Sequence, residues 1–269
     1  MNTPGLPEFS GLAPLHGPAA NLASPVAPPP PLPTGIPRAA PAAAPPVTDT
    51  NRRIARWAVD AWLLARQDSA EPQLAVQPSY GRSQAGAVLR YQLAPGAAHD
   101  VQAYARASAA LAGPRERELA AGLSARPLPA LPLRVYAEAR VGESGGEAAV
   151  RPALFAVTEL SPQRLPLGLR GEAYLQAGYV GGDRATAFVD GQARAERPIA
   201  RRGEAEFTAG AGGWGGAQTG AARLDIGPTA SASFPLGSGR ARIAADFRLR
   251  VAGTAAPASG AAVTLSAGF

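Results

Sequence analysis

Two glycine-rich motifs and a histidine hold the residue types of this 269-residue sequence that could support catalysis. Residues 142–146 match the G-x-S-x-G pattern, with Ser144 as the nucleophile. That chemistry needs the serine on a strand-to-helix turn with a histidine within reach. No helical pattern follows Ser144, and His99 is the one candidate base because His16 lies in a proline-rich tail. We therefore interpret the motif as a chance match in a hairpin loop.

Residues 210–215 match G-x-G-x-x-G, which binds dinucleotides only between a strand and a helix. A second strand pattern follows instead, so we expect these glycines to serve a strand end and a loop. His99 with Asp100 is half of a hydrolytic pair, and we interpret it as a solvated turn. The chain has no cysteine and two histidines, which excludes disulfides and cysteine-based zinc sites. We predict no catalytic, cofactor-binding or metal-binding residues.

The charge pattern argues against a nucleic-acid partner. Arginine supplies all 26 basic residues, against 20 acidic residues, for a net charge of +6. The acidic residues are interspersed with the arginines, whereas a nucleic-acid site gathers positive charge into a patch or stripe. A mixture of this kind is typical of a solvated surface or a wet interior.

Composition divides the chain into three parts. Residues 1–47 hold 14 of the 28 prolines and are predicted to be a disordered tail or linker. Residues 48–68 are predicted to form one amphipathic helix, because Ile54, Trp57, Ala61 and Ala65 recur at three- and four-residue spacing. Residues 70–269 are predicted to be a β domain. The start of the chain lacks a basic segment followed by an apolar run, so no signal peptide is visible.

From residue 70 onward the hydrophobic period is two. In the run from Leu133 to Val141, Leu133, Val135 and Ala137 share one face, while Arg134 and Glu138 share the other. The same alternation recurs through the rest of the chain. It predicts twelve strands, over residues 73–80, 84–95, 100–111, 117–126, 131–141, 149–160, 167–180, 184–196, 204–213, 221–234, 240–252 and 261–269.

These strands predict an all-β fold, an antiparallel transmembrane β-barrel of about twelve strands. Tilted strands of about ten residues match the thickness of a bilayer, and bacterial single-chain barrels have an even number of strands. Apolar faces would then meet lipid and polar faces would line the lumen, with Trp214 at the membrane interface. A soluble sandwich, which buries the apolar face, has the same alternation and stays open as an alternative.

The last strand carries a family resemblance. Val263, Leu265 and Phe269 share one face, and Phe269 ends an alternating strand as in the terminal strands of bacterial outer-membrane barrels. The stretch from Tyr80 to Phe269 resembles the C-terminal barrel of phage-adsorption-type outer-membrane proteins. The segments SYGRSQAGAVLRYQL and AARLDIGPTASASFPL carry much of that likeness. The resemblance implies an outer-membrane location and recognition of Phe269 by the barrel-insertion machinery.

The polar face is predicted to line the lumen with charge of both signs, eight arginines and six acids. These residues are Arg134, Glu138, Arg140, Arg170, Glu172, Asp190, Arg194, Glu196, Arg223, Asp225, Arg242, Asp246, Arg248 and Arg250. Such side chains form cross-strand ion pairs in a narrow barrel and set ion selectivity in a wide one. We expect the interior to be salt-bridged, with little conduction.

These observations predict a non-enzymatic outer-membrane module of a Gram-negative bacterium that acts as a surface anchor, receptor or passage for a polymer or solute. The expected partners are outer-membrane lipid, the insertion machinery and a surface polysaccharide or phage, with no nucleic acid and no cofactor. A lipid-acting hydrolase built on His99 and a serine, or a soluble β domain, are the alternatives. The missing signal peptide would require that the chain start inside a longer gene product.

Overall fold

The computed structural model describes residues 56–67, 83–111, 117–144, 147–182 and 185–269. The predicted tail, residues 1–47, and the first predicted strand, residues 73–80, lie outside the described residues. Each of the other eleven predicted strands overlaps one long strand of the structure, and seven of the observed strands extend beyond the predicted bounds.

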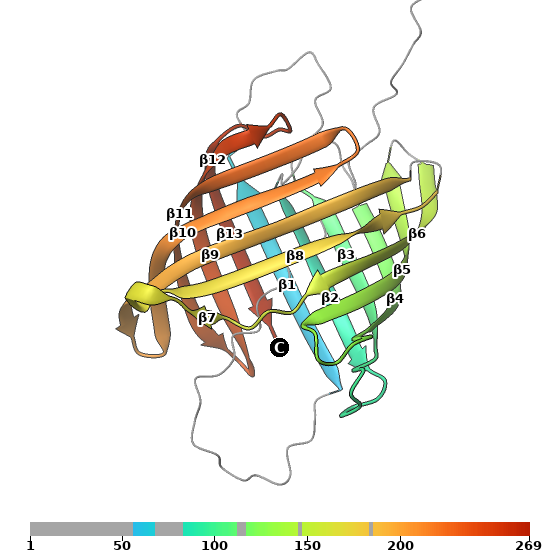
Figure 1. Cartoon of the computed structure of the whole chain (residues 1–269), viewed down its shortest axis with the longest axis horizontal. Helices are drawn as coiled ribbons and strands as arrows, with labels where there is room; N and C mark the ends of the chain where they lie inside the picture. Colours follow the sequence, from blue (N-terminus) through green and yellow to red (C-terminus); the bar gives the residue numbers. More distant parts are fainter. Residues whose placement is uncertain (1–55, 68–82, 112–116, 145–146, 183–184) are drawn as a thin grey trace, which may run out of the picture.

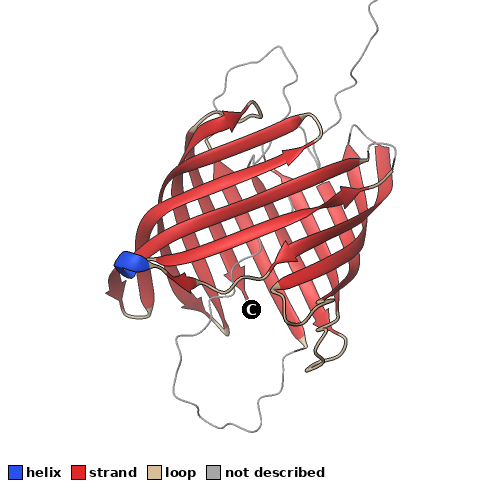
Figure 2. Ribbon diagram, viewed as in Figure 1, coloured by secondary structure: helices blue, strands red, loops and turns tan. Residues whose placement is uncertain are grey.

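Within the described residues, twelve long antiparallel strands form one closed barrel (Figures 1 and 2). Neighbours in sequence pair in turn, and β1 pairs with β13 to complete the ring. A two-residue strand, β7, and a short 3-10 helix, η1, lie in the connection from β6 to β8. The bounds are β1 Trp57–Arg66, β2 Gln84–Gln92, β3 Gln102–Ala110, β4 Arg117–Ala125, β5 Leu133–Ser144, β6 Glu147–Thr158, β7 Gln163–Arg164, η1 Pro166–Gly168, β8 Arg170–Val180, β9 Thr186–Arg202, β10 Ala205–Gln218, β11 Ala221–Leu236, β12 Gly239–Gly253 and β13 Gly260–Gly268.

The predicted helix over residues 48–68 is wrong where the structure describes it. Residues 57–66 form strand β1, which pairs with β13 on one side and β2 on the other. The segment also alternates with period two, since Trp62, Leu64 and Arg66 are buried while Leu63 and Ala65 are exposed. Two flanking ladders decide between these periodicities, because tertiary context overrides local propensity. The barrel therefore begins at Trp57 rather than near residue 70.

The two faces of the sheet are inverted relative to a water-soluble domain. Large apolar side chains cover the outside, and each of the following is at least 39% exposed: Leu63, Leu89, Leu119, Leu123, Val141, Leu154, Leu175, Val189, Leu224, Ile226, Ile243, Phe247, Leu249, Val251, Val263 and Leu265. The buried side chains of the same strands are largely charged or polar. This distribution is the one that transmembrane barrels have. Among the described residues, no helix is long and apolar enough to cross a membrane.

The connections between the strands lie at two opposite rims of the barrel. The C-terminal rim holds Phe269 and the turns after β2, β4, β6, β9 and β11, and the opposite rim holds those after β8, β10 and β12. Phe269 extends the closing ladder, because its N–H and C=O both bond to Val59, at 2.9 and 3.1 Å. Gly203 and Gly237 have positive φ in the tight turns of the C-terminal rim, a conformation that glycine adopts without strain.

Candidate functional site: the charged barrel interior

The structure places most of the fourteen predicted lumen residues inside the barrel. Nine are buried, with exposed fractions from 0 to 9%: Arg134, Glu138, Arg140, Arg194, Glu196, Arg223, Asp225, Asp246 and Arg248. Glu172, Asp190 and Arg242 are half-buried. Arg170, near the C-terminal rim, and Arg250, near the opposite rim, are exposed. The buried residues fall into separate clusters of ion pairs.

Glu138 is the centre of the first cluster. Its carboxylate accepts from Arg106 Nη2 at 3.1 Å, from Arg140 Nε at 2.5 Å and from the Tyr104 hydroxyl at 2.6 Å. Arg106 also donates to Glu118 Oε1 at 2.6 Å. The side chains of these four charged residues are at most 2% exposed, so the ions hold one another in place of water. Arg106 on β3 reaches Glu138 on β5 across the intervening strand β4.

An aromatic row lies beside the Glu138 cluster. Tyr136 stacks on Phe155 with ring centroids 4.8 Å apart and meets Tyr104 edge-on at 5.3 Å. The guanidinium of Arg140 lies 5.7 Å from the ring centroids of both Phe155 and Phe188. Its two terminal nitrogens have no hydrogen-bond partner among the described residues, so the two rings stabilise this cation in addition to the Nε bond to Glu138.

Asp246 and Glu196 are the centre of the second cluster. Asp246 accepts from Arg248 at 2.9 Å and from Arg194 at 3.3 Å. Arg242 donates to Glu196 at 2.6 Å and to Glu172 at 2.8 Å. Glu172 lies on β8 and Arg242 on β12, four strand positions away and ~19 Å along the wall. A direct contact between them therefore crosses the inside of the barrel as a chord.

Trp214 belongs to this second cluster and not to a membrane interface. Its ring is 6% exposed, and the guanidinium groups of Arg248 and Arg194 lie 4.5 and 5.6 Å from ring centroids of the indole. The predicted interface position is wrong because Trp214 shares the interior face of its strand, paired with Gln192 and Asp225 on the flanking strands. The indole thus fills space between two arginines.

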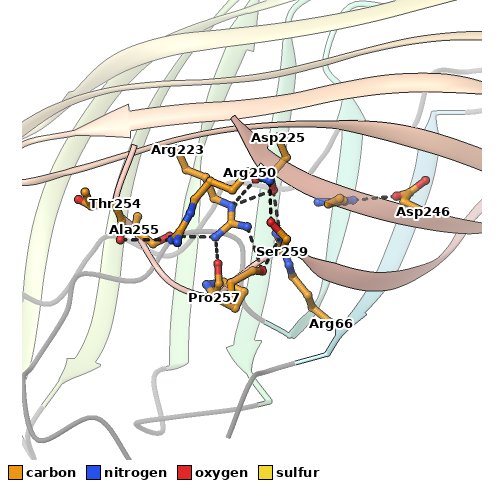
Figure 3. A network of polar contacts seen from close by, with 11 residues as sticks. Arg66, Arg223, Asp225, Asp246, Arg250, Thr254, Ala255, Pro257 and Ser259 are labelled. Atoms are coloured by element: carbon orange, nitrogen blue, oxygen red, sulfur yellow. Dashed lines mark hydrogen bonds and ion pairs between the residues drawn. The ribbon is translucent and has the colours of Figure 1, made fainter. Parts of the chain in front are cut away.

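The third cluster lies at the opposite rim and is drawn in Figure 3. Asp225 accepts from Arg223 Nε at 2.8 Å and from Arg66 Nη2 at 3.0 Å, and all three side chains are at most 2% exposed. Arg223 and Arg250 also donate to backbone carbonyls of residues 254–259, the segment between β12 and β13. The segment turns inward, since Ala255 is 1% exposed and Pro257 is buried.

The C-terminal rim has a fourth cluster around Arg134. Arg134 pairs with Asp100 and donates through Nε to Glu159 at 2.8 Å. Arg126 donates to the other oxygen of Glu159 at 2.6 Å. These residues come from three successive links of this rim and from β5, so the cluster ties the links together. His99 lies here, with Nδ1 3.0 Å from the Arg126 carbonyl oxygen.

The geometry supplies no catalytic arrangement for the predicted motifs. His99 contacts main chain at the C-terminal rim, whereas Ser144 ends β5 at the opposite rim. Residues 210–215 lie within β10, paired with β9 and β11, so no helix follows them and the dinucleotide motif lacks its required setting. No group of three potential metal ligands occurs among the residues that the structure describes.

The sequence did not predict several of the interior residues. They are Arg66, Tyr104, Arg106, Glu118, Arg151 and Trp214. Arg106 and Glu118 share the inward parity of Gln102 and Ser124 on β3 and β4, so extending the alternation to those two strands would have found them. Arg66 was hidden by the predicted helix.

Comparisons with known proteins give distant structural likenesses. No protein-family model matches the sequence, and no curated protein matches it. The β domain of the Bordetella autotransporter BrkA is similar at 10% identity and a TM-score of 0.43, over 79% of this chain and 98% of that one. A bacterial polysaccharide outer membrane secretin is similar at 11% identity and a TM-score of 0.39, over 79% and 97% of the two chains.

The closed antiparallel sheet with a polar interior and an apolar outside decides the fold class. The chain has the fold of an outer-membrane β-barrel. None of the comparisons identifies the phage-adsorption family, so that resemblance stays a prediction.

Proposed function

We propose that this protein is a non-enzymatic barrel in the outer membrane of a Gram-negative bacterium, and that it acts as a surface anchor with a closed interior. The observation that carries the proposal is the set of ion pairs that cross the interior, above all half-buried Arg242 to Glu172 and fully buried Arg66 to Asp225. A wide aqueous channel would keep such charges hydrated and separate. Here they meet across the inside.

Electrostatics favours the closed interior. A buried ion pair is weak as a source of stability, but breaking one costs about 3–5 kcal/mol because it leaves an uncompensated charge. Glu138 and Asp246 each hold two arginines, so opening a path past either cluster would separate several charges together. Thermal motion alone does not supply that energy. The barrel is therefore expected to conduct no steady ionic current.

The outside supports the membrane location. The apolar belt has no described partner, and lipid is the partner that satisfies an apolar belt around a closed barrel. Phe269 is 51% exposed at the end of the closing ladder, where the insertion machinery would reach it. The proposed partners are accordingly outer-membrane lipid and the insertion machinery. We also propose that the protein is not an enzyme.

Planar-bilayer recording on the full chain tests the closed interior. We expect the folded protein to insert and to give no steady conductance, with insertion checked by heat-modifiable migration of protein recovered from the same vesicles. Large, stable, anion-selective steps would contradict the anchor and make the protein a channel. Recovery of the expressed protein in the aqueous phase after lysis would contradict the membrane location.

A further inference from the structure

The segment at residues 254–259 lies on a seat made by three arginines at the opposite rim (Figure 3). Arg223 donates to the carbonyls of Ala255 at 2.8 Å, of Pro257, and of Ala258 at 3.2 Å. Arg66 reaches the Ala258 carbonyl at 3.4 Å. Arg250 donates from its side chain to the carbonyls of Thr254 at 3.5 Å and Ala255 at 3.1 Å, and from its main chain to Ser259 Oγ at 2.9 Å.

The charge of this seat is not balanced by what lies on it. Three arginines converge there, and among the contacts of the described residues Asp225 is the one carboxylate that pairs with them. The segment itself reads Thr-Ala-Ala-Pro-Ala-Ser and carries no charged side chain. Arg66 and Arg223 are 6 and 5% exposed, so little water screens the excess positive charge. The other clusters around Glu138 and Asp246 hold more than one carboxylate each.

We propose that Arg66, Arg223 and Arg250 form a binding site for a phosphate- or carboxylate-bearing solute, and that residues 254–259 occupy this site as an internal competitor. Their carbonyl oxygens stand where the oxygens of the bound anion would be. Binding displaces the segment and opens the barrel at this rim.

The bonding favours an anion over the segment. Hydrogen bonds to an ionised acceptor are roughly twice as strong as those between neutral groups, and a planar guanidinium matches a two-oxygen acceptor. The segment has the advantage of being tethered, since β12 and β13 hold both of its ends close to the seat. A solute must therefore reach a threshold concentration before it displaces the segment. Because Arg66 and Arg223 face the interior, the solute arrives through the mouth of the barrel and not from surrounding lipid.

Calorimetric titration of the full chain in a neutral detergent tests the site, with tripolyphosphate and citrate as the phosphate and carboxylate probes. The matched variants are Arg250→Gln at the seat and Arg201→Gln at the C-terminal rim, because both arginines are exposed and neither carries the fold. Arg250→Gln should weaken binding about tenfold, the loss of one charged hydrogen bond, whereas Arg201→Gln should not change it. The stronger of the two probes identifies the class of anion.

Displacement of the segment has its own measurement, because the chain contains no cysteine and a single introduced thiol is unique. Ala255→Cys places a thiol at a 1% exposed position, and Thr254→Cys places one at an exposed neighbour as the control. The neutral reagent N-ethylmaleimide should modify Ala255→Cys slowly. The probe that binds should raise that rate at least tenfold, at the concentration that saturates the calorimetric signal, and leave Thr254→Cys unchanged.

Three results obtained with the probes would overturn the proposal. They are no binding of either probe, binding that Arg250→Gln and Arg201→Gln affect equally, and binding that leaves the Ala255→Cys rate unchanged. A thiol at residue 255 that reacts as fast as one at residue 254 before any probe is added contradicts the internal competition. These assays run in detergent, so a failure here is distinct from a failure of the membrane location or of the closed interior.

Discussion

Replacing Glu138 by alanine should destabilise the barrel far more than replacing a carboxylate that pairs with the same number of arginines at the surface. Glu138 accepts from Arg106, Arg140 and Tyr104, and its side chain is 0% exposed. After the substitution Arg106 keeps Glu118, but Arg140 keeps only the rings of Phe155 and Phe188. One buried cation is left without a carboxylate, for which the expected loss is about 3–5 kcal/mol.

Glu206 is the matched control for Glu138. It also holds two arginines, Arg170 at 2.7 Å and Arg201 at 3.3 Å, but those arginine side chains are 49 and 67% exposed. Exposed pairs of this kind contribute about 0–1 kcal/mol. Glu206→Ala should therefore lower the free energy of unfolding by less than about 1 kcal/mol.

Urea unfolding in lipid vesicles, followed by tryptophan fluorescence, measures both variants. Trp62 and Trp214 are buried in the barrel, so their emission reports its loss. Glu138→Gln keeps the size of the side chain and one acceptor oxygen, and should fall between the wild type and Glu138→Ala. Equal losses for Glu138→Ala and Glu206→Ala would refute the reasoning, because the interior charges would then be hydrated and not paired.

Three further predictions concern the outside, the terminal strand and conduction. Val263→Arg places a charge on the apolar outside and should lower the free energy of unfolding by about 2–4 kcal/mol in the same assay. Thr264→Arg, at the half-buried neighbouring position on the interior face, should lower it less, and the reverse order would put the apolar face in the core of a soluble domain. Phe269→Asp should reduce the amount of heat-modifiable protein in outer-membrane fractions, whereas Leu167→Asp, at an apolar residue that is 88% exposed at the same rim, should not. Equal amounts of the two variants in these fractions would contradict the role of Phe269 in insertion. Replacing Arg248 and Arg250 together by glutamine removes one arginine partner of Asp246, and should raise the bilayer conductance or shift its selectivity toward cations. A double variant that still conducts no current would show that other ion pairs close the interior.

The strands were predictable because alternation is a local property. In the run from Leu133 to Val141 successive residues lie on opposite faces of the strand, and the burial of the side chains in the structure follows the same alternation. Residues 57–66 misled the prediction because tryptophan, alanine and leucine suit either period there, and only the ladders with β2 and β13 separate the two. Those partners lie far along the sequence, so no local pattern reports them.

The partners of the interior charges were predictable only in part. Sequence parity selects which residues face inward, as for Glu196 and Asp246. It does not say that Arg242 meets Glu172, since that contact depends on the circumference of the ring and on the stagger between strands. The inward segment at residues 254–259 was likewise invisible, because its uncharged sequence matches that of an ordinary glycine-flanked loop.

The exclusive use of arginine has a structural consequence inside this barrel. A guanidinium presents five N–H donors in a fixed fork, whereas a lysine ammonium is a single point of charge. Arg242 joins two carboxylates through its two terminal nitrogens, and Arg223 joins one carboxylate through Nε to the carbonyls of residues 254–259 through its terminal nitrogens. A lysine at these positions would carry all of its donors on one nitrogen, so it could not contact the separate acceptors from separate atoms. The narrow closed interior and the arginine content are thus linked, because each fork makes several connections from one place on the wall.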